Sequence, residues 1–261
     1  MNIVLCIKQV PDTADIKWTE NNTIKREGVE SIINPFDTYA IETALKIKDI
    51  EKNTNISVIT MGPNQAKEVL KKALSVGADK GILLSDKKFS GADTVATSKT
   101  LARAISEKCS DFDMIICGQF ATDGDTAQTP PSIAQHLNIP SVTYVKKIES
   151  IKDGFAIVQR EVEDGIEILR VKLPALFCML KGDYELRRPL IRGFIKAHNS
   201  KIETYTHEDI NLPIEDIGIK GSPTFVSKAF RPEQKHLCET VLCQEKDSLT
   251  KLVDKIKMWS K

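Results

Sequence analysis

Short apolar runs alternate with amphipathic segments along the first two thirds of the chain, and this alternation constrains the fold more than any other feature. Four short runs occupy positions 2–7, 56–62, 81–85 and 113–118. Uninterrupted runs of this kind are typical of parallel strands buried on both faces of a sheet. Apolar residues recur at helical spacing over 37–51, 66–74 and 93–108. The pattern predicts an α/β fold with a doubly wound, mostly parallel sheet.

The pattern changes after Pro140. Successive strands are expected at 142–149, 155–162, 166–173 and 175–180. The Asp-Gly pairs between them, at 153–154 and 164–165, are strong hairpin signals. We therefore expect an antiparallel addition to the parallel sheet.

The C-terminal part of the chain differs again in composition. Residues 205–247 are rich in Pro, Gly and charge and are too long for an ordinary internal loop. The chain then ends in a short helix, one face of which carries Leu249, Leu252, Val253, Ile256 and Trp259. We expect a nucleotide-binding α/β domain over residues 1–200 and an extended C-terminal arm over 201–261, whose helix docks on another surface.

Charge and composition argue against several classes of protein. The 37 basic residues are nearly balanced by 36 acidic ones, whereas nucleic-acid-binding proteins usually carry a basic excess. No apolar run approaches the roughly 20 residues of a membrane span, and the N-terminus lacks the features of a signal peptide. Six irregularly spaced cysteines indicate a reducing compartment. We expect a cytoplasmic protein, without a metal because His236, Cys238 and Cys243 are too few to form a typical site.

The loop that follows the fourth apolar run carries the strongest local signal of ligand binding. Residues 118–129 read GQFATDGDTAQT and lead into a helix, where free backbone N–H groups and the helix dipole can hold a phosphate. Pro130 and Pro131 follow and have no N–H group. The donors must therefore come from residues 124–129, with the hydroxyls of Thr126 and Thr129 assisting. An ordinary helix start capped by Thr129 remains the alternative.

No pattern of catalytic side chains accompanies this loop. The four histidines are scattered, and there is neither a Gly-x-Ser-x-Gly sequence nor a Walker-type Gly-Lys-Ser/Thr sequence. Nucleotide hydrolysis is therefore not expected. Redox chemistry would have to come from a cofactor.

Five segments together resemble the beta subunit of the electron-transfer flavoproteins. They are CIKQVPDT at 6–13, GVESIINPFDTYAIETAL at 28–45, TMGPNQAKEVLKKALSVGADKGILL at 60–84, GQFATDGDTAQT at 118–129 and LRVKLPAL at 169–176. The match runs in order over at least residues 1–200. It implies a partner alpha subunit and an adenine cofactor held in a pocket of this chain.

The resemblance also implies which residues contact that cofactor. By position they are Cys6, Ile7, Lys8, Gln9, Asn34, Pro35, Phe36, Asp37, Met61, Gly62, Gly118, Gln119, Phe120, Ala121, Thr122, Asp123, Gly124, Asp125, Thr126, Ala127, Gln128 and Thr129. Simple members of the family hold AMP in this pocket, and electron-bifurcating members hold a second FAD beside an NADH site. Residues 123–128 resemble the FAD-holding version, because the glycine and alanine leave room for a pyrophosphate to approach the backbone. FAD is therefore expected, with AMP as the alternative.

A second segment resembles the part of bifurcating members that lines the NADH site. It is FSGADTVATSKTLA at 89–102, and the residues that would contact NAD(H) are Gly91, Ala92, Asp93, Thr94 and Thr97. The alternative is simply a capped helix start, because Asp is a favoured N-cap residue.

A basic stretch at 178–200 aligns with the loop by which the family docks onto a dehydrogenase. The residues expected to dock are Glu185, Arg187, Arg188, Ile191 and Lys196. Leu186-Arg187-Arg188 replaces the usual Pro-Arg-Tyr, so the partner flavin dehydrogenase could be an acyl-CoA dehydrogenase or a lactate-type 2-hydroxyacid dehydrogenase. A solvated charged loop is the alternative.

The resemblance therefore implies a redox subunit that works only in complex with its partners. Electrons from NADH would divide between a low-potential acceptor, ferredoxin or flavodoxin, and the dehydrogenase. Two alternatives stay open: a plain electron carrier with structural AMP, and a nucleotide-sensing module of the universal-stress type. The sensor would leave the antiparallel addition, the basic loop and the terminal helix without a role.

Overall fold

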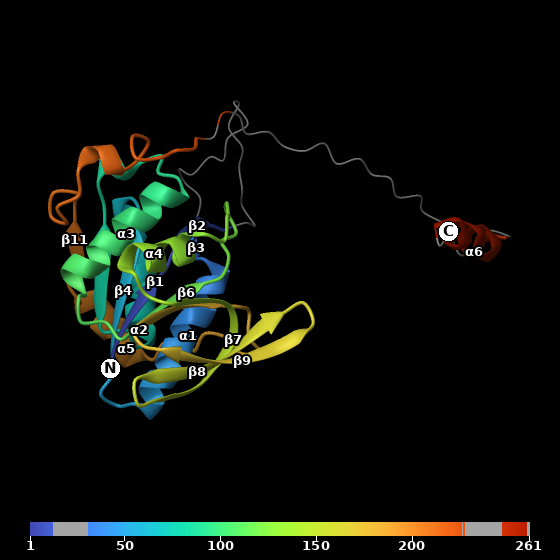
Figure 1. The fold of residues 1–261 in the computed structure, drawn as a ribbon, viewed down its shortest axis with the longest axis horizontal. Coiled ribbons are helices and arrows are strands. Elements are labelled where there is room, and N and C mark those ends of the chain that lie inside the picture. Colours follow the sequence, from blue (N-terminus) through green and yellow to red (C-terminus); the bar gives the residue numbers. More distant parts are fainter. Residues whose placement is uncertain (13–30, 226, 228–246, 260–261) are drawn as a thin grey trace. The chain divides into compact units, whose positions relative to one another are not determined.

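The computed structural model describes residues 1–12, 31–225, 227 and 247–259 (Figure 1). The chain divides into two compact units, Met1–Ser227 and Lys228–Lys261. The first unit contains a nine-stranded sheet and five α-helices, and the second contributes one described helix, α6 (Ser248–Trp259).

The large sheet has the strand order β11-β5-β4-β1-β6-β10-β7-β8-β9. Its strands are β1 (Asn2–Cys6), β4 (Asn55–Met61), β5 (Lys80–Leu84), β6 (Met114–Gly118), β7 (Ser141–Lys152), β8 (Phe155–Val162), β9 (Gly165–Lys172), β10 (Ala175–Met179) and β11 (Glu203–Tyr205). All neighbours from β11 to β7 are parallel, and β8 and β9 add an antiparallel edge. The predicted doubly wound sheet with an antiparallel addition is confirmed.

Helices cover both faces of this sheet. They are α1 (Pro35–Ile50), α2 (Lys67–Val76), α3 (Thr94–Lys108), α4 (Thr129–Leu137) and α5 (Ile191–Asn199), with short 3-10 turns η2 (Asn64–Ala66), η3 (Lys87–Phe89) and η4 (Ile214–Asp216). Alternate strand residues belong to different cores: Ile3 and Leu5 pack with α1 and α2, whereas Val4 and Cys6 pack with α3 and α4. The apolar runs are uninterrupted because both faces of each central strand are buried.

One strand assignment needs correction. The sequence places the strands at 142–149 and 175–180 in the antiparallel addition. β7 does pair antiparallel with β8, but β10 pairs with β7 in parallel. β10 also pairs in parallel with β6, so it enters the centre of the sheet. Hairpin signals identify neighbours along the chain and carry no information on a strand that returns from β9 to the centre. All five residues of β10 are buried, as expected of a central position.

Four elements have no counterpart among the expected ones. β2 (Gln9–Pro11) and β3 (Ser31–Ile33) form a small antiparallel ribbon. The basic stretch near residue 190 is helical as α5, and β11 pairs with β5, so the sheet extends past residue 200. Each strand is only three residues long, which gives too little periodicity to detect in a sequence.

The described part of the second unit confirms the expected terminal helix. On α6 the side chains of Leu249, Leu252, Val253 and Ile256 are exposed. The cluster of His236, Cys238 and Cys243 lies outside the described residues. No helix among the described residues is long and apolar enough to cross a membrane.

Helix α5 packs on α2 through small residues. A Cβ atom added at Gly193 would lie only 2.1 Å from the carbonyl oxygen of Ser75, and Ala197, one turn later, is buried. The opposite face of α5 carries Ile191, Phe194 and Ile195, all exposed. The close approach of the two helices therefore fixes which side of α5 faces outward.

We expect Gly193→Ala to destabilise the protein by about 1–3 kcal/mol, because α5 must move away from the Ser75 carbonyl. In an unconstrained helix the same change stabilises by about 1 kcal/mol, so the sign is diagnostic. Urea unfolding measures it. Phe194→Ala on the exposed face of the same helix is the control and should stay within about 0.5 kcal/mol of wild type. A more stable Gly193→Ala protein would contradict the close contact.

Candidate functional site

Three segments meet where β1 and β6 end, at the carboxyl edge of the parallel sheet, and a buried carboxylate joins them. Asp37 lies in the first turn of α1. Its Oδ2 accepts a hydrogen bond from the backbone N–H of Lys8 at 2.6 Å, and its Oδ1 accepts one from Gly118 at 3.2 Å. A Cβ atom at Gly118 would lie 2.4 Å from Oδ1, so only glycine fits there. Ligands of open α/β sheets bind at this edge.

Asn34 completes the junction from the residue before α1. Its side-chain amide donates to the carbonyl of Phe120 at 2.7 Å and accepts from the N–H of Thr122 at 3.3 Å. Its own N–H donates to the carbonyl of Lys8. Asn34 and Asp37 are almost fully buried, so their polar groups act on the protein's own backbone and hold the loop of residues 118–129 in place.

We call residues 118–129 the cofactor loop. The middle of this loop is held by the side chain of Lys8. The ammonium of Lys8 pairs with Asp123 Oδ1 at 2.5 Å and reaches the carbonyl of Gly124 at 3.4 Å. The Lys8 side chain is about half exposed. The loop is therefore anchored at both its start and its middle, while its later residues project outward.

Several donors of the cofactor loop remain without a protein partner. The N–H groups of Ala127 and Gln128 donate to the side chains of Asp125 and Thr126. Among the described residues, nothing accepts from the backbone N–H of Gly124, Asp125, Thr126 or Thr129. A cluster of exposed amide donors next to a helix start suits an anionic group. Gly124 has no atom within 4 Å of an added Cβ, so the backbone there is open to a ligand.

The capping alternative for this loop is wrong in its specific form. Helix α4 has Gln128 as its N-cap residue and no side-chain cap, and Thr129 is the first helical residue. Pro130 and Pro131 occupy the first turn of α4. Backbone N–H groups there have no acceptor within the helix, so the N–H that proline lacks costs no helical hydrogen bond. The helix therefore starts without using the donors of the cofactor loop.

The second predicted segment, at the start of α3, adjoins the first. The hydroxyls of Thr94 and Thr126 are 2.9 Å apart. Asp93 caps α3 by accepting from the N–H groups of Val95 and Ala96 at 2.9 and 3.1 Å, so the capped-start alternative is confirmed for this residue. Contacts with a second ligand would then have to come from the backbone of residues 91–92 and from hydroxyls such as that of Thr94.

Aromatic side chains lie beside the cofactor loop, and only Phe36 and Phe120 were among the expected residues. Phe120 packs edge-to-face against Phe36, with ring centroids 5.3 Å apart, and against Tyr144 at 6.0 Å. Gln119 is buried, and its amide oxygen accepts from the N–H of Tyr144 at 2.7 Å. Gln119 is thus a brace for the protein itself. Tyr144 belongs to β7, and no local signal marks it.

Other expected contacts line the same edge at the ends of β1 and β4. Cys6 is buried and stands in register with Cys117, which is in register with Cys178. Burial raises the pKa of Cys178 to about 12, so its thiol is not a nucleophile. Ile7 is buried, whereas Met61 and Gly62 remain partly accessible.

One buried polar atom in this region has no partner in the described part of the chain. The amide nitrogen Nε2 of Gln9 is buried and donates to none of the described residues. A buried donor without an acceptor costs free energy, and a bound group can remove that cost. Among the described residues no cluster of His, Cys, Asp and Glu could hold a metal.

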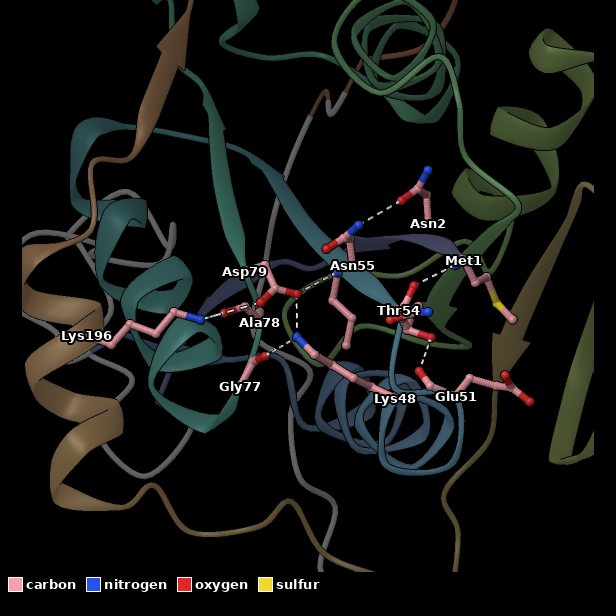
Figure 2. A network of polar contacts seen from close by, with 12 residues as sticks. Met1, Asn2, Lys48, Glu51, Thr54, Asn55, Gly77, Ala78, Asp79 and Lys196 are labelled. Carbon is pink, nitrogen blue, oxygen red and sulfur yellow. Dashed lines mark hydrogen bonds and ion pairs between the residues drawn. The ribbon is translucent and has the colours of Figure 1, made fainter.

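The residues expected to dock a dehydrogenase differ in their surroundings. Arg187 donates to the buried carboxylate of Glu42 and to Asp49 of α1 at 2.7–2.8 Å, and these contacts raise its pKa further above its ordinary value. Lys196 donates to Asp79 and to the carbonyl of Ala78, at the starts of β4 and β5 (Figure 2).

The remaining docking residues are open to solvent. Glu185, Arg188 and Ile191 are exposed, Ile191 to 81%. Arg187 and Lys196 therefore hold the segment onto the body of the protein, and the exposed surface is the apolar face of α5 with its polar neighbours.

Comparison with known proteins now decides the family. The profile described as "Electron transfer flavoprotein domain" matches residues 21–209. The chain belongs to the electron transfer flavoprotein family. This assignment removes the universal-stress alternative.

Relatives that cover nearly the whole chain include two that are named as subunits. The caffeyl-CoA reductase-Etf complex subunit CarD of Acetobacterium woodii is 47% identical over 90% of this chain and 89% of its own. The electron transfer flavoprotein subunit beta of Thermoanaerobacterium thermosaccharolyticum is 42% identical over 98% of both chains. Protein FixA of Sinorhizobium fredii is 42% identical over 98% of this chain and 93% of its own. The chain is thus a beta subunit, and beta subunits of this family pair with alpha subunits.

We expect the stability of the free chain to fall as pH rises from about 4 to about 7, because burial raises the pKa of Asp37 from 3.8 to about 7. Hydrogen bonds from Lys8, Asn34 and Gly118 oppose this rise only in part. Within this pH window the folded state keeps a proton that the unfolded state has released, so the free energy of unfolding falls as pH rises.

Urea unfolding of wild type and Asp37→Asn across this pH range tests the prediction. The Asn variant should be less stable overall, because its amide N–H₂ would face one of the backbone N–H groups that now donate to Asp37. Its stability should also depend less on pH. Equal slopes for both proteins would contradict a raised pKa at Asp37.

Proposed function

We propose that this beta subunit binds FAD at the cofactor loop and NAD(H) at the adjoining start of α3. Together with its alpha subunit it takes electrons from NADH and divides them between ferredoxin or flavodoxin and a flavin-dependent dehydrogenase. The observation that carries the proposal is the 2.9 Å contact between Thr94 and Thr126. This contact places the start of α3 beside the cofactor loop, which supports two ligands side by side. A single AMP would use only the cofactor loop.

The residues at the carboxyl edge fit an FAD molecule. The free N–H groups of Gly124, Asp125, Thr126 and Thr129 would hold the pyrophosphate. The unpartnered Gln9 Nε2 lies on the β2–β3 ribbon and would donate to the isoalloxazine ring system. AMP has no isoalloxazine ring to accept from this donor, so Gln9 favours the larger cofactor.

Flavin supplies the chemistry that the side chains lack: it accepts two electrons as a hydride and releases electrons singly. The protein's own contribution is to position and shield. Asn34 and Asp37 hold the cofactor loop through hydrogen bonds to its backbone. Phe36, Phe120 and Tyr144 provide an apolar aromatic cluster beside the loop, and apolar surroundings exclude water from reacting groups.

The outward face of α5 is proposed as the docking surface for the dehydrogenase. Its exposed apolar residues are Leu190, Ile191, Phe194 and Ile195, and Arg188 and Arg192 are exposed beside them. Large apolar side chains ringed by charge are typical of binding hot spots. Either an acyl-CoA dehydrogenase or a 2-hydroxyacid dehydrogenase with an apolar pocket and acidic rim would fit. The exposed apolar face of α6 is proposed to bind the alpha subunit.

The purified heterodimer should contain two FAD per pair and should be reduced by NADH. Flavin content after denaturation and anaerobic spectra with NADH measure both. One FAD and one AMP per pair would instead show the simple electron carrier and would refute the proposal.

Ile191→Ala should weaken dehydrogenase-dependent electron transfer about tenfold, because a central apolar anchor is lost. NADH-dependent reduction of the heterodimer should not change. Ile168→Ala on the edge strand β9 is the matched control, since Ile168 is also largely exposed. Equal effects of the two substitutions would show that α5 is not the docking surface.

A further inference from the structure

Residues 217–224, which we call the strap, lie across the loop that precedes α3. Ile217 is buried in the same core as α3. A Cβ atom added at Gly218 would lie 2.0 Å from the carbonyl oxygen of Lys88. One added at Gly91 would lie 2.5 Å from the Ile219 side chain. The strap and the loop therefore pack so closely that neither can shift alone.

The far end of the same loop is held by a separate contact. Asp86 lies after β5, and its Oδ2 is 2.6 Å from Nδ1 of His207, which is buried. The chain from 207 to 224 is thus attached at both ends of the loop of residues 86–93. Farther along helix α3, Arg103 donates to the carbonyl of Ile210 at 3.0 Å and Lys99 pairs with Asp216. The attachment at Asp93 is the one at the start of the helix.

Asp93 uses both carboxylate oxygens, each for a different element. Oδ1 caps α3, whereas Oδ2 accepts from the N–H of Thr224 at 3.0 Å and from its hydroxyl at 2.7 Å. The backbone N–H of Asp93 donates to the Ser222 hydroxyl at 2.8 Å. Partial burial raises the pKa of Asp93, but the hydrogen bonds from Ala96, Thr224 and Val95 outweigh it and lower the pKa, which favours the carboxylate.

The residue next to Asp93 touches the cofactor loop. Thr94 Oγ1 lies 2.9 Å from Thr126 Oγ1, and Thr126 also accepts from the N–H of Gln128. Hydrogen bonds therefore connect Ser222 and Thr224 to Asp93 and connect the next residue, Thr94, to the cofactor loop.

We infer that Asp93 is a positioning residue that fastens the strap to the start of α3 and thereby sets the place of Thr94 beside the cofactor loop. The mechanical part of this inference stands on the contacts alone. Its consequence for the dinucleotide rests on the proposed function, because Thr94 is an expected NAD(H) contact.

The chemistry of the two oxygens shows what Asp93 contributes beyond a helix cap. Asn caps helices as well as Asp does, but its amide would turn an N–H₂ donor toward the N–H of Thr224. Asp93→Asn therefore keeps α3 capped and removes the acceptor for the N–H of Thr224, while the backbone contact with Ser222 remains. Thr224→Val removes the hydroxyl contact from the other side, and Thr224→Ser retains it as the matched control.

The test uses the heterodimer and measures amide hydrogen exchange in the strap and in residues 124–129. Asp93→Asn and Thr224→Val should each speed exchange in both segments by about fivefold or more, since each removes a hydrogen bond to a charged group. The double variant should show little further effect, because both changes break one contact. Thr224→Ser should resemble wild type. Faster exchange in the strap alone would overturn the inference.

Steady-state reduction by NADH gives the second readout. The KM for NADH should rise about fivefold in Asp93→Asn and Thr224→Val with kcat within about twofold, whereas a general loss of folding would lower kcat. An unchanged KM with altered exchange would overturn the link to the dinucleotide. If wild type is not reduced by NADH at all, the proposed function fails, and the exchange results still decide the role of Asp93.

Discussion

Asp37 stands in the first turn of α1 with both carboxylate oxygens turned toward backbone N–H groups of other segments. Burial makes its charge costly, and the two hydrogen bonds that it accepts join the ends of β1 and β6 to the start of α1. Asn34 extends the same junction to the middle of the cofactor loop. Hydrogen bonds within the protein therefore hold the carboxyl edge of the sheet in its shape without a ligand.

Helix α1 also connects the carboxyl edge of the sheet to the proposed docking surface. Its first turn holds the cofactor edge through Asp37, and its later turns present Glu42 and Asp49 to Arg187. Tyr184 packs edge-to-face against Tyr39 of the same helix, and its hydroxyl hydrogen-bonds to that of Thr43. One rigid element thus positions both the proposed cofactor pocket and the segment that leads into the α5 docking face.

Local sequence was informative wherever one physical cause acted within one segment. The apolar runs of β1, β4, β5 and β6 lie within one residue of the predicted bounds, because burial on both faces leaves no polar interruption. Asp93 as a cap could be read from its place before a helix. The direction of β10 could not be read, since it depends on which distant strands it joins.

By itself the sequence determined the class of fold and the place of most of its longer strands along the chain, and it predicted the loop where a ligand would bind. It also carried the resemblance that the family match supports. Only the tertiary structure decided which polar residues serve the protein itself, such as Asn34, Asp37 and Arg187. It also joined Thr94 to Thr126 and Asp93 to Thr224, residues 32 and 131 positions apart. Such contacts arise when the sheet brings separate loops to one edge, and no local pattern records them.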